Sequence, residues 1–575
     1  TLQKEGELEA SLRHVEELQM MGADAVIVQD RGLLRAIGEE LSIPVHASTQ
    51  MGIHSLDGVR WAQEHGVQRV ILSRELSLDE ISALAKDSGT ELEVFVHGAL
   101  CYCFSGQCLF SSMLGGRSGN RGLCAQPCRK RYRLGAEEGF LLSTADTCGI
   151  DSLRELLRLG VAAVKIEGRM RSPEYVYAAT LAYRNALGRA ERGEETLLTP
   201  REKDMLETAF NRGFSPGYLR SREVMQRRFP ESRGRPLGPA ISDGKELALY
   251  DPRIEDGDGI TIYSRGEKSG GFLMDRSRER DGVLYLRPPF RVEVGAYEAY
   301  KTRDRELALL EVQLSKEQLP SADIPEASLA LTFPRAERAP GRPLLSFYVN
   351  SVGVLKAVLP FADRIYYEQG KGWEEAEDLC QREEVPLVAL LPRVDLGAAT
   401  EASAVMVSNL GQAHRYQERE VYLSQHMNAF NSLAVQGRQT TLSVELSRQD
   451  IADILGHTRI PVEVMAFGRT ELMVTRDPSL KEGQLVDETG TRFAVYRDQY
   501  GWAHILNSAD LFLLDHVGEL AALGVDSLGL DVRRRHPDVA ALVGRAFAKG
   551  DISLKGELKK ACGAITSFHY SNGVA

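Results

Sequence analysis

The chain repeats itself, and this internal repeat constrains its fold more than any other feature of its 575 residues. The segment from Ala145 to Glu174 matches the segment from Ala509 to Asp538 at one constant offset. At a slightly larger offset, Ser73–Ser77 matches Ser443–Ser447. Repetition over such long segments indicates that one type of domain occurs twice, which halves the number of folds to explain.

Short β-rich runs alternate with amphipathic helical stretches in both halves, which predicts βαβ units and a parallel sheet. The second half has three runs at its front that the first half lacks, and so it reaches the eight strands of a (β/α)₈ barrel. These extra runs are Leu345–Val349, Arg364–Tyr367 and Pro386–Leu391. The runs of the first half are Ala25–Gln29, Pro44–Ser48, Arg69–Ser73, Leu92–Val96, Phe140–Leu142 and Ala163–Ile166.

This comparison predicts an α/β protein with two TIM-like barrels, the first of which lacks its N-terminal strands, plus a small antiparallel β module. The first half begins level with the fourth strand of the second, and the chain opens without an initiator Met, so we expect the sequence to be incomplete at its start. The expected domains are a first barrel at 1–185 with a cysteine-rich insertion at 99–135, a helical and loop extension at 186–235, the β module at 236–330, and a second barrel without a cysteine site, followed by a tail, at 331–575.

The composition excludes several classes of protein. Hydrophobic residues make up 43% and charged residues 26%, as in soluble globular proteins. No apolar run is long enough to cross a membrane and no secretory leader is visible, so we expect a cytoplasmic protein with no membrane partner. The net charge of −11 argues against general coating of nucleic acid but permits a local basic site. Nothing in the sequence predicts the oligomeric state.

Six of the eight cysteines lie close together in the first half, in and beside a Gly-rich insertion. They are Cys101, Cys103, Cys108, Cys124, Cys128 and Cys148. In a large chain that is otherwise poor in cysteine, such a group indicates a metal or iron–sulfur site rather than a disulfide framework. Four thiolates suit an iron–sulfur cluster or zinc. The alternative is that they are small buried packing residues.

The second half provides an internal control for these cysteines. Cys101, Cys108 and Cys148 align there with Glu471, Pro478 and Phe512. The barrel pattern therefore survives without thiols, which favours a function confined to the first half. Because Cys101 and Cys148 follow predicted strands, we expect them at the C-terminal rim, where barrels build their active sites.

The insertion is basic, with six cations and no acid between Ser111 and Arg133. Guanidinium groups suit bidentate contact with phosphate or carboxylate, although a solvated charged loop is the alternative. The substrate-binding candidates are Arg117, Arg121, Arg129, Arg131 and, from the predicted rim, Gln50.

Several polar residues follow the predicted strands and are rim candidates: Gln29, Asp30, His46, Gln50, Arg74, Glu75, His97, Lys165, Glu167 and Arg169. The catalytic candidates among them are His97, Glu75, Glu167 and Arg169. Glu75 and Glu167 have acidic counterparts in the second half, which weakens a purely catalytic interpretation of both. The chain has no His-Glu-x-x-His motif, no Gly-x-Ser-x-Gly elbow and no Walker A loop.

The segment Glu93-Val-Phe-Val-His-Gly-Ala-Leu-Cys101, followed by Gly106-Gln-Cys-Leu-Phe-Ser111, resembles the signature of the collagenase-like peptidase family U-32. Phe110 stands where that signature usually has an aliphatic residue. The resemblance is strong over residues 1 to about 235 and looser beyond. Other segments similar to the family are Gly115–Gly122, Cys124–Cys128, Lys165–Met170 and Phe210–Phe214.

The resemblance implies two competing activities. One is proteolysis, with collagen as a proposed substrate and no assigned catalytic type. The other is RNA hydroxylation at C5 of a pyrimidine in transfer or ribosomal RNA, with prephenate required, and the longer members look closest to the ribosomal-RNA enzyme. Relatives in ubiquinone biosynthesis carry a 4Fe–4S cluster on four cysteines. The implied ligands here are Cys101, Cys108, Cys124 and Cys148, with Cys128 as the alternative fourth.

We favour RNA hydroxylation because a cysteine cluster has a role in redox chemistry and none in simple proteolysis. The basic insertion beside it suits an RNA backbone. The expected cofactor is therefore a 4Fe–4S cluster, and the expected partners are RNA and a small carboxylate, with prephenate as co-substrate. The alternatives are a peptidase and a zinc-stabilised RNA-binding scaffold.

Overall fold

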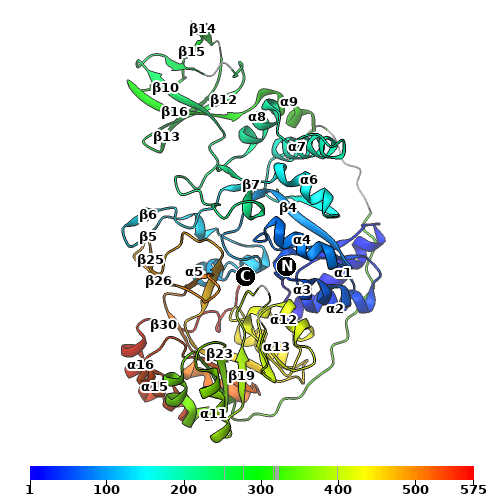
Figure 1. Cartoon of the computed structure of the whole chain (residues 1–575), viewed down its shortest axis with the longest axis vertical. Coiled ribbons are helices and arrows are strands. Elements are labelled where there is room, and N and C mark those ends of the chain that lie inside the picture. Colours follow the sequence, from blue (N-terminus) through cyan, green and yellow to red (C-terminus); the bar gives the residue numbers. More distant parts are fainter. Residues whose placement is uncertain (251–252, 276, 315, 317–322, 396, 398) are drawn as a thin grey trace.

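The computed structural model describes the chain except residues 251–252, 276, 315, 317–322, 396 and 398. Parts of the expected β module and second barrel thus lie outside the described residues. The molecule is elongated, with an antiparallel sheet at one end, the first half in the middle and the second half at the other end (Figure 1). No helix among the described residues is both long and apolar enough to cross a bilayer.

Eight parallel strands of the second half close into a barrel. Each strand pairs with the next, and the last strand pairs with both the first and the seventh. The closed barrel confirms the α/β class. Its strands are β17 (Leu344–Val349), β18 (Arg364–Glu368), β19 (Leu387–Leu390), β20 (Ala404–Val407), β21 (Glu420–Leu423), β22 (Gln439–Thr441), β23 (Val462–Gly468) and β29 (Ser527–Asp531). Its helices are α10 (Val352–Val358), α11 (Trp373–Arg382), α12 (Leu410–Arg415), α13 (Arg448–Leu455), α14 (Val517–Ala522), α15 (Pro537–Lys549) and α16 (Lys555–Cys562).

The first half forms an open sheet whose strands follow the same order as the last part of the barrel. Its parallel strands are β1 (Val26–Val28), β2 (Val45–Ala47), β3 (Val67–Ile71), β4 (Glu91–Ala99) and β8 (Ala163–Ile166). In both halves an antiparallel strand joins the sheet: β7 (Asp146–Cys148) pairs with β4, and β28 (Asp510–Phe512) pairs with β23. Two short strands extend these edges, β9 (Phe214–Ser215) beside β7 and β30 (Ile565–Thr566) beside β28.

The open sheet packs against the outside of the closed barrel. Its hydrophobic core includes Ala389, Val405, Val407 and Leu423, which come from strands β19 to β21 of the second half. The same core includes Val28, Val45 and Val70 of the open sheet. The apolar surface of an open sheet must be buried against another element, and here the second half supplies it.

The helices of the open sheet begin where the sequence places capping residues. The Ser77 hydroxyl accepts a hydrogen bond from the N–H of Glu80, while the Glu80 carboxylate accepts one from the N–H of Ser77. Ser447 and Asp450 form the same two bonds in the second half. The repeat therefore preserves helix starts as well as strands. The helices of the first half are α1 (Leu8–Met20), α2 (Arg31–Glu40), α3 (Leu56–Glu64), α4 (Leu78–Asp87) and α6 (Leu153–Arg158).

Residues that follow the first half form helices and a separate antiparallel sheet. The helices α7 (Pro173–Glu191), α8 (Pro200–Ala209) and α9 (Arg305–Leu314) lie between the open sheet and this sheet (Figure 1). The sheet has its own apolar core. Its strands are β10 (Arg235–Ser242), β11 (Leu247–Leu249), β12 (Gly259–Ser264), β13 (Glu267–Leu273), β14 (Arg278–Arg280), β15 (Val283–Leu286) and β16 (Gly295–Arg303).

A fourth sheet joins the two halves. Strands β5 (Tyr132–Leu134) and β6 (Glu137–Gly139) of the insertion extend a sheet of the second half, with β5 paired to β25. The remaining strands are β24 (Glu471–Thr475), β25 (Gly483–Asp487), β26 (Arg492–Arg497) and β27 (Ala503–Leu506). The expected strand at Phe140–Leu142 is wrong, because the strand that pairs with β4 lies at β7 instead.

Candidate functional site

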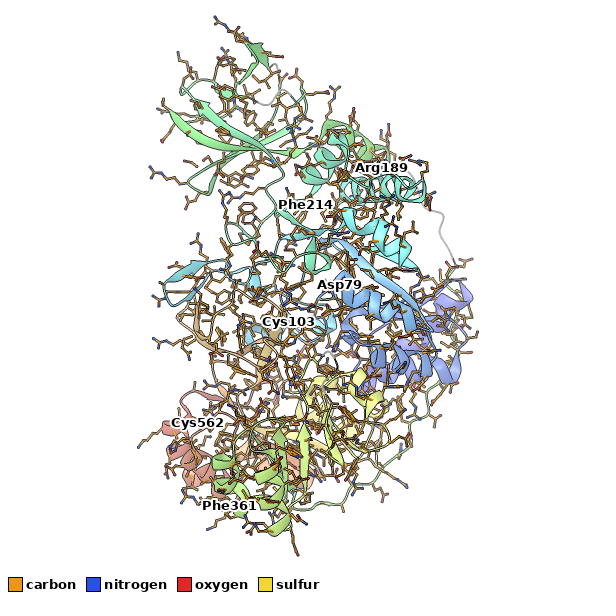
Figure 2. All side chains as sticks on the ribbon, in the orientation of Figure 1. Asp79, Cys103, Arg189, Phe214, Phe361 and Cys562 are labelled. Atoms are coloured by element: carbon orange, nitrogen blue, oxygen red, sulfur yellow. The ribbon has the colours of Figure 1, made fainter. Side chains whose placement is uncertain are left out.

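The cysteine-rich insertion leaves β4, includes the short helix α5 (Phe110–Gly115) and returns through β5, and both halves hold it. The N–H of Phe104 donates to the carbonyl of Val474 at 2.8 Å, in addition to the pairing of β5 with β25. Gly106 adopts a φ of +74°, and a Cβ there would clash with the carbonyl of Gln50. Only glycine fits this close approach. In Figure 2, Cys103 lies near the centre of the molecule, whereas Cys562 lies in the far part of the second half.

Five cysteines of the insertion lie in one region, with Cys103 buried beside Cys108, and Cys148 lies in another. Cys101, Cys108 and Cys128 pack against a hydrophobic cluster that the insertion shares with the second half. The Cys124 sulfur and the Cys108 carbonyl both lie 4.0 Å from the position that a Cβ on Gly119 would take. Cys148 packs instead against the core of the first half. The contacts thus place Cys128, rather than Cys148, beside the other three thiols.

Burial keeps these thiols protonated. It raises the pKa of Cys101 and of Cys128 to about 12, and the neighbouring Cys108 thiol adds to the shift in both cases. Burial also raises the pKa of the exposed-loop residue Cys124, although the N–H of Gln126 donates to its sulfur at 3.3 Å and opposes the shift. Because thiolate is the metal-binding form, ligation here must release protons.

The donor set fits an iron–sulfur group in its chemistry, since it consists of four thiols in a largely apolar setting. The spacing is looser than ligation demands. Within the described ranges, no three His, Cys, Asp or Glu side chains lie close enough together to hold a metal ion. The sulfurs of Cys101, Cys108, Cys124 and Cys128 must therefore move closer together to bind one.

His97 lies in the interior behind the rim. It is 1% exposed and pairs with Cys148 across β4 and β7. The Tyr183 hydroxyl lies 3.3 Å from its Nδ1, and its Nε2 has no hydrogen-bond partner among the described residues. Burial lowers the pKa of His97 to about 4, while the charge of Asp146 opposes the shift. The imidazole is therefore neutral at physiological pH.

Glu75 is buried in the loop that follows β3, and its carboxylate contacts the insertion weakly. The Ser105 hydroxyl donates to its carboxylate at 3.3 Å. Burial raises the pKa of Glu75 to about 7, and the Arg74 charge opposes the shift. A carboxyl group with such a pKa can donate or accept a proton near neutral pH.

Glu167 and Arg169 follow β8 and face different surroundings. The backbone of Glu167 is fixed, because its N–H donates to the His97 carbonyl at 2.8 Å and its own carbonyl accepts from the Tyr175 hydroxyl at 2.7 Å. Arg169 is exposed, and its guanidinium lies 3.2 Å from the position that a Cβ on Gly122 would take. Arg169 therefore faces the insertion.

Two of the four predicted substrate-binding arginines are engaged in the protein itself. Arg121 forms an ion pair with Glu7 at 2.7 Å and donates to the carbonyl of Leu2 at 2.9 Å. Arg129 donates to the hydroxyls of Ser143 and Thr144 at 2.7 and 3.0 Å. Both side chains hold the insertion in place.

The other candidates are less constrained. Arg117 is exposed and donates to the carbonyl of Leu123 in its own loop, at 3.1 Å. Arg131 lies over the ring of Phe140, 5.1 Å from its centroid. Gln50 donates to the Gly119 carbonyl at 3.4 Å and so contacts the insertion from the rim.

Sequence reasoning missed a group of arginines beside the thiols. Arg212 is buried, and its Nε donates to Asp146 at 3.0 Å. Arg171 lies 3.5 Å from the ring centroid of Phe210. Burial, and then the charge of Arg212, lowers the pKa of both Arg129 and Arg171. Arg129 and Arg212 both lie near Cys128 and near the single carboxylate of Asp146, which leaves an excess of positive charge beside that thiol. The signal was the Asn211-Arg212-Gly213 motif, which sequence reasoning used only for the family resemblance.

The chain matches the model of peptidase family U32 over residues 1–228 and 393–551, which together make up more than half of it. It therefore belongs to this family, as the sequence motifs predicted. The matched residues include the whole open sheet, the insertion and most of the closed barrel.

Curated relatives of this chain have two kinds of name. It is 34% identical over 292 residues to the 23S rRNA 5-hydroxycytidine C2501 synthase of Escherichia coli. This alignment covers 47% of this chain and 44% of the relative. It is 33% identical over 263 residues to the tRNA hydroxylation protein P of Helicobacter pylori, covering 42% of this chain and 60% of the relative. A collagenase of Porphyromonas gingivalis is 32% identical over 227 residues, covering 36% and 54%. The chain thus spans about half the length of these relatives.

Proposed function

We propose that this protein hydroxylates RNA, replacing the C5–H of a pyrimidine with C5–OH, and that a 4Fe–4S cluster on Cys101, Cys108, Cys124 and Cys128 serves the reaction. The observation that carries the proposal is the gathering of thiols in the segment between β4 and β7, beside several arginines, whereas the corresponding segment between β23 and β28 of the second half contains no cysteine. Two of the relatives bear the names of RNA hydroxylases.

The residues around the thiols suit an anionic substrate. Arg117 and Arg169 are exposed at the insertion and are free to contact phosphate, while Arg129, Arg171 and Arg212 leave an excess of positive charge behind them. Guanidinium groups bind phosphate and carboxylate equally well, so a small carboxylate such as prephenate would bind the same region as co-substrate.

The reaction needs both a redox group and a proton acceptor. Replacing C5–H with C5–OH at the expense of water releases two electrons and two protons, so it needs a two-electron oxidant from outside the chain; an iron–sulfur cluster, when bound, would pass these electrons one at a time. Glu75 is the best-placed candidate for the proton, because its pKa of about 7 lets it change protonation state near neutral pH. His97 is less suited, since burial lowers its pKa to about 4 and so makes it a weak proton acceptor near neutral pH.

The test is mass spectrometry of RNA from a strain that lacks this protein. Transfer and ribosomal RNA should each be digested to nucleosides and compared with RNA from the complemented strain. We expect one hydroxylated pyrimidine to disappear on deletion and to return with the wild-type chain. Identical nucleoside profiles, combined with cleavage of collagen or gelatin by the purified protein, would favour the peptidase activity that one relative's name describes.

A zinc-stabilised RNA-binding scaffold makes a different prediction. Such a protein would contain zinc, no sulfide and no visible absorption band, and its deletion would leave the nucleosides unchanged. Metal analysis of anaerobically purified protein separates this alternative from the hydroxylase.

A further inference from the structure

A buried carboxylate of the second half faces the cysteine insertion and has no role in the proposed function. It belongs to Glu445, which lies in the loop between β22 and α13 and is 0% exposed. Neither of its two carboxylate oxygens has a hydrogen-bond partner among the described residues. Burying an unpaired carboxylate costs free energy, so its presence at this position needs an explanation.

The polar groups that face this carboxylate all belong to the insertion. Burial raises the pKa of Glu445, and the side chains of Ser112, Ser118 and Asn120 oppose the shift. The Ser118 Oγ and Asn120 Nδ2 atoms are themselves buried, and within the described part of the chain neither has a hydrogen-bond partner. The Ser112 hydroxyl donates instead to the carbonyl of Leu109 at 2.9 Å. Two unpaired donors of the insertion therefore lie beside two unpaired acceptors of the second half.

These two donors belong to the turn that carries Cys124, which comprises residues 118–123 and is called the Cys124 turn below. The N–H of Leu123 donates to the carbonyl of Ser118 at 2.9 Å and so closes the turn. A Cβ on Gly119 would lie 3.6 Å from the Cβ of Cys124. A movement of the turn therefore moves Cys124 with it.

The first half contacts the insertion through the equivalent residue. Glu75 occupies the position of Glu445 in the repeat, and its carboxylate accepts from the Ser105 hydroxyl at 3.3 Å. Ser105 precedes Cys108, whereas the groups that face Glu445 lie between Cys108 and Cys124. Each half thus presents a buried carboxylate to a different segment of the insertion.

We propose that Glu445 is a positioning residue for Cys124, whose turn it fixes by accepting hydrogen bonds from Ser118 and Asn120 as the thiols gather around a metal group. The sulfurs must approach one another before they can bind such a group, and the unpaired atoms identify the bonds that form in that movement. Residues that orient metal ligands in this way typically change metal affinity about 10- to 100-fold when they are replaced. As far as it concerns the cluster, this inference rests on the proposed function.

The test compares variants of the full chain, purified anaerobically and studied both metal-free and after reconstitution with iron and sulfide. Glu445→Leu removes both acceptors at similar volume, whereas Glu445→Gln keeps one acceptor oxygen. Ser118→Ala removes one donor. The matched controls are Glu463→Leu and Glu463→Gln, because Glu463 is equally buried but accepts from Tyr348 and Ser527 inside the closed barrel. Circular dichroism checks that each variant folds.

The first measurement is the rate at which an excess of chelator removes iron from the reconstituted protein. Glu445→Leu should release iron about tenfold faster than wild type, and Glu445→Gln should restore most of the difference. Ser118→Ala should speed release in the wild-type background but not in the Glu445→Leu background, since its acceptor is already missing there. The Glu463 controls should release iron at the wild-type rate.

The second measurement is hydrogen–deuterium exchange over the Cys124 turn of the metal-free protein. Exchange in this turn should be about tenfold faster in Glu445→Leu and unchanged in the Glu463 controls, because only Glu445 faces it. This readout is local, so a general loss of stability would not reproduce it.

Wild-type rates of iron release and exchange in Glu445→Leu would overturn the proposal, as would equal effects in the controls or additive effects of Glu445→Leu and Ser118→Ala. If Glu445→Leu does not fold, the same comparison between Ser118→Ala and Glu445→Gln decides the question. A wild-type protein that takes up no iron and sulfide would count against the proposed function alone. In that case an unchanged exchange rate over the Cys124 turn in Glu445→Leu or Glu445→Gln would still overturn this inference.

Discussion

The two halves of this protein share a backbone plan and differ in what lies at their mouths. Gly98 and Gly468 end equivalent strands at φ values of +101° and +128°. In both places an added Cβ would lie 2.6 Å from a carbonyl oxygen, that of Glu167 in the first half and of Asp531 in the second. Features that recur in this way serve the fold, so neither the glycines nor these acidic positions by themselves indicate chemistry.

The differences between the halves indicate where chemistry is located. In the second half Arg533 pairs with Asp531 at 2.7 Å. Its counterpart in the first half, Arg169, is exposed and faces the insertion instead. A small pocket in the first half is lined by His97 and Leu100 of the β4 region and by Tyr218. The comparison teaches that the thiols, which only the first of two corresponding segments contains, mark the half in which chemistry is expected.

The strongest test of this difference is the removal of one thiol from the insertion. Cys108→Ser should abolish iron binding and RNA hydroxylation together, because a cluster that loses one of four ligands is not retained in a competent state. Cys380→Ser, at a buried cysteine in the second half, should change neither. Iron analysis and nucleoside mass spectrometry of the complemented deletion strain measure both. Normal RNA modification with Cys108→Ser would contradict the proposal.

The shared backbone plan predicts equal effects of equivalent glycine substitutions. Gly98→Ala and Gly468→Ala should each destabilise the protein by about 3–4 kcal/mol, since both place a Cβ against a fixed carbonyl in a strained conformation. Gly38→Ala, in helix α2 with open space around it, should stabilise slightly. Thermal unfolding midpoints provide the measurement. A large effect at Gly98 with none at Gly468 would show that the halves are not equivalent.

The buried carboxyl group of Glu75 predicts a pH-dependent stability. Its pKa is raised from 4.5 to about 7 in the folded protein, so the folded state keeps a proton that the unfolded state releases. Stability relative to Glu75→Gln should be greatest below about pH 4.5 and should fall as the pH rises towards 7, by at most about 3 kcal/mol. Burial also raises the pKa of its counterpart Glu445, so Glu445→Gln should act in the same direction. The measurement is the unfolding midpoint of wild type and of Glu75→Gln, from about pH 4 to about pH 8. If the two midpoints change in parallel over this range, the carboxyl group of Glu75 does not titrate as proposed.

The smallest expected effects separate two arginines of the insertion. Arg121→Ala should destabilise the protein by about 1–2 kcal/mol, because it removes the partner of Glu7. Arg117→Ala should change the free energy of unfolding by less than about 0.5 kcal/mol. It should make RNA binding less dependent on salt: the slope of the logarithm of the binding constant against the logarithm of the salt concentration should decrease by somewhat less than about one unit. Binding titrations at several salt concentrations test this. An unchanged slope for Arg117→Ala would show that this arginine contacts solvent alone.

Much of the fold could be predicted from the sequence because periodicity and repetition are local signals. The runs at Ala163–Ile166 and Leu345–Val349 predicted β8 and β17 closely. The strand at β7 was misplaced, because Phe140–Leu142 is more apolar than Asp146–Cys148, and apolar content is the signal that predicts a strand. The pairing of β7 with β4 depends on contacts that are distant in the sequence.

The site was harder to predict than the fold. The sequence identified the thiols as a group, yet Cys128 and Cys148 are equally plausible by spacing, and only their packing against different cores distinguishes them. The role of Arg121 was also hidden, because its partner Glu7 is distant in the sequence and belongs to another element. Long-range pairing of this kind leaves no local pattern.

The central claim of this account is that the thiols of the insertion, with Cys128 as the fourth, hold an iron–sulfur cluster. Iron and acid-labile sulfide in anaerobically purified protein test it most directly, with Cys128→Ser compared with Cys148→Ser. The account predicts that Cys128→Ser loses iron, sulfide and visible absorption, while Cys148→Ser keeps all three. Retention of the cluster by Cys128→Ser and its loss from Cys148→Ser, or a wild-type protein that holds zinc and no sulfide, would contradict it.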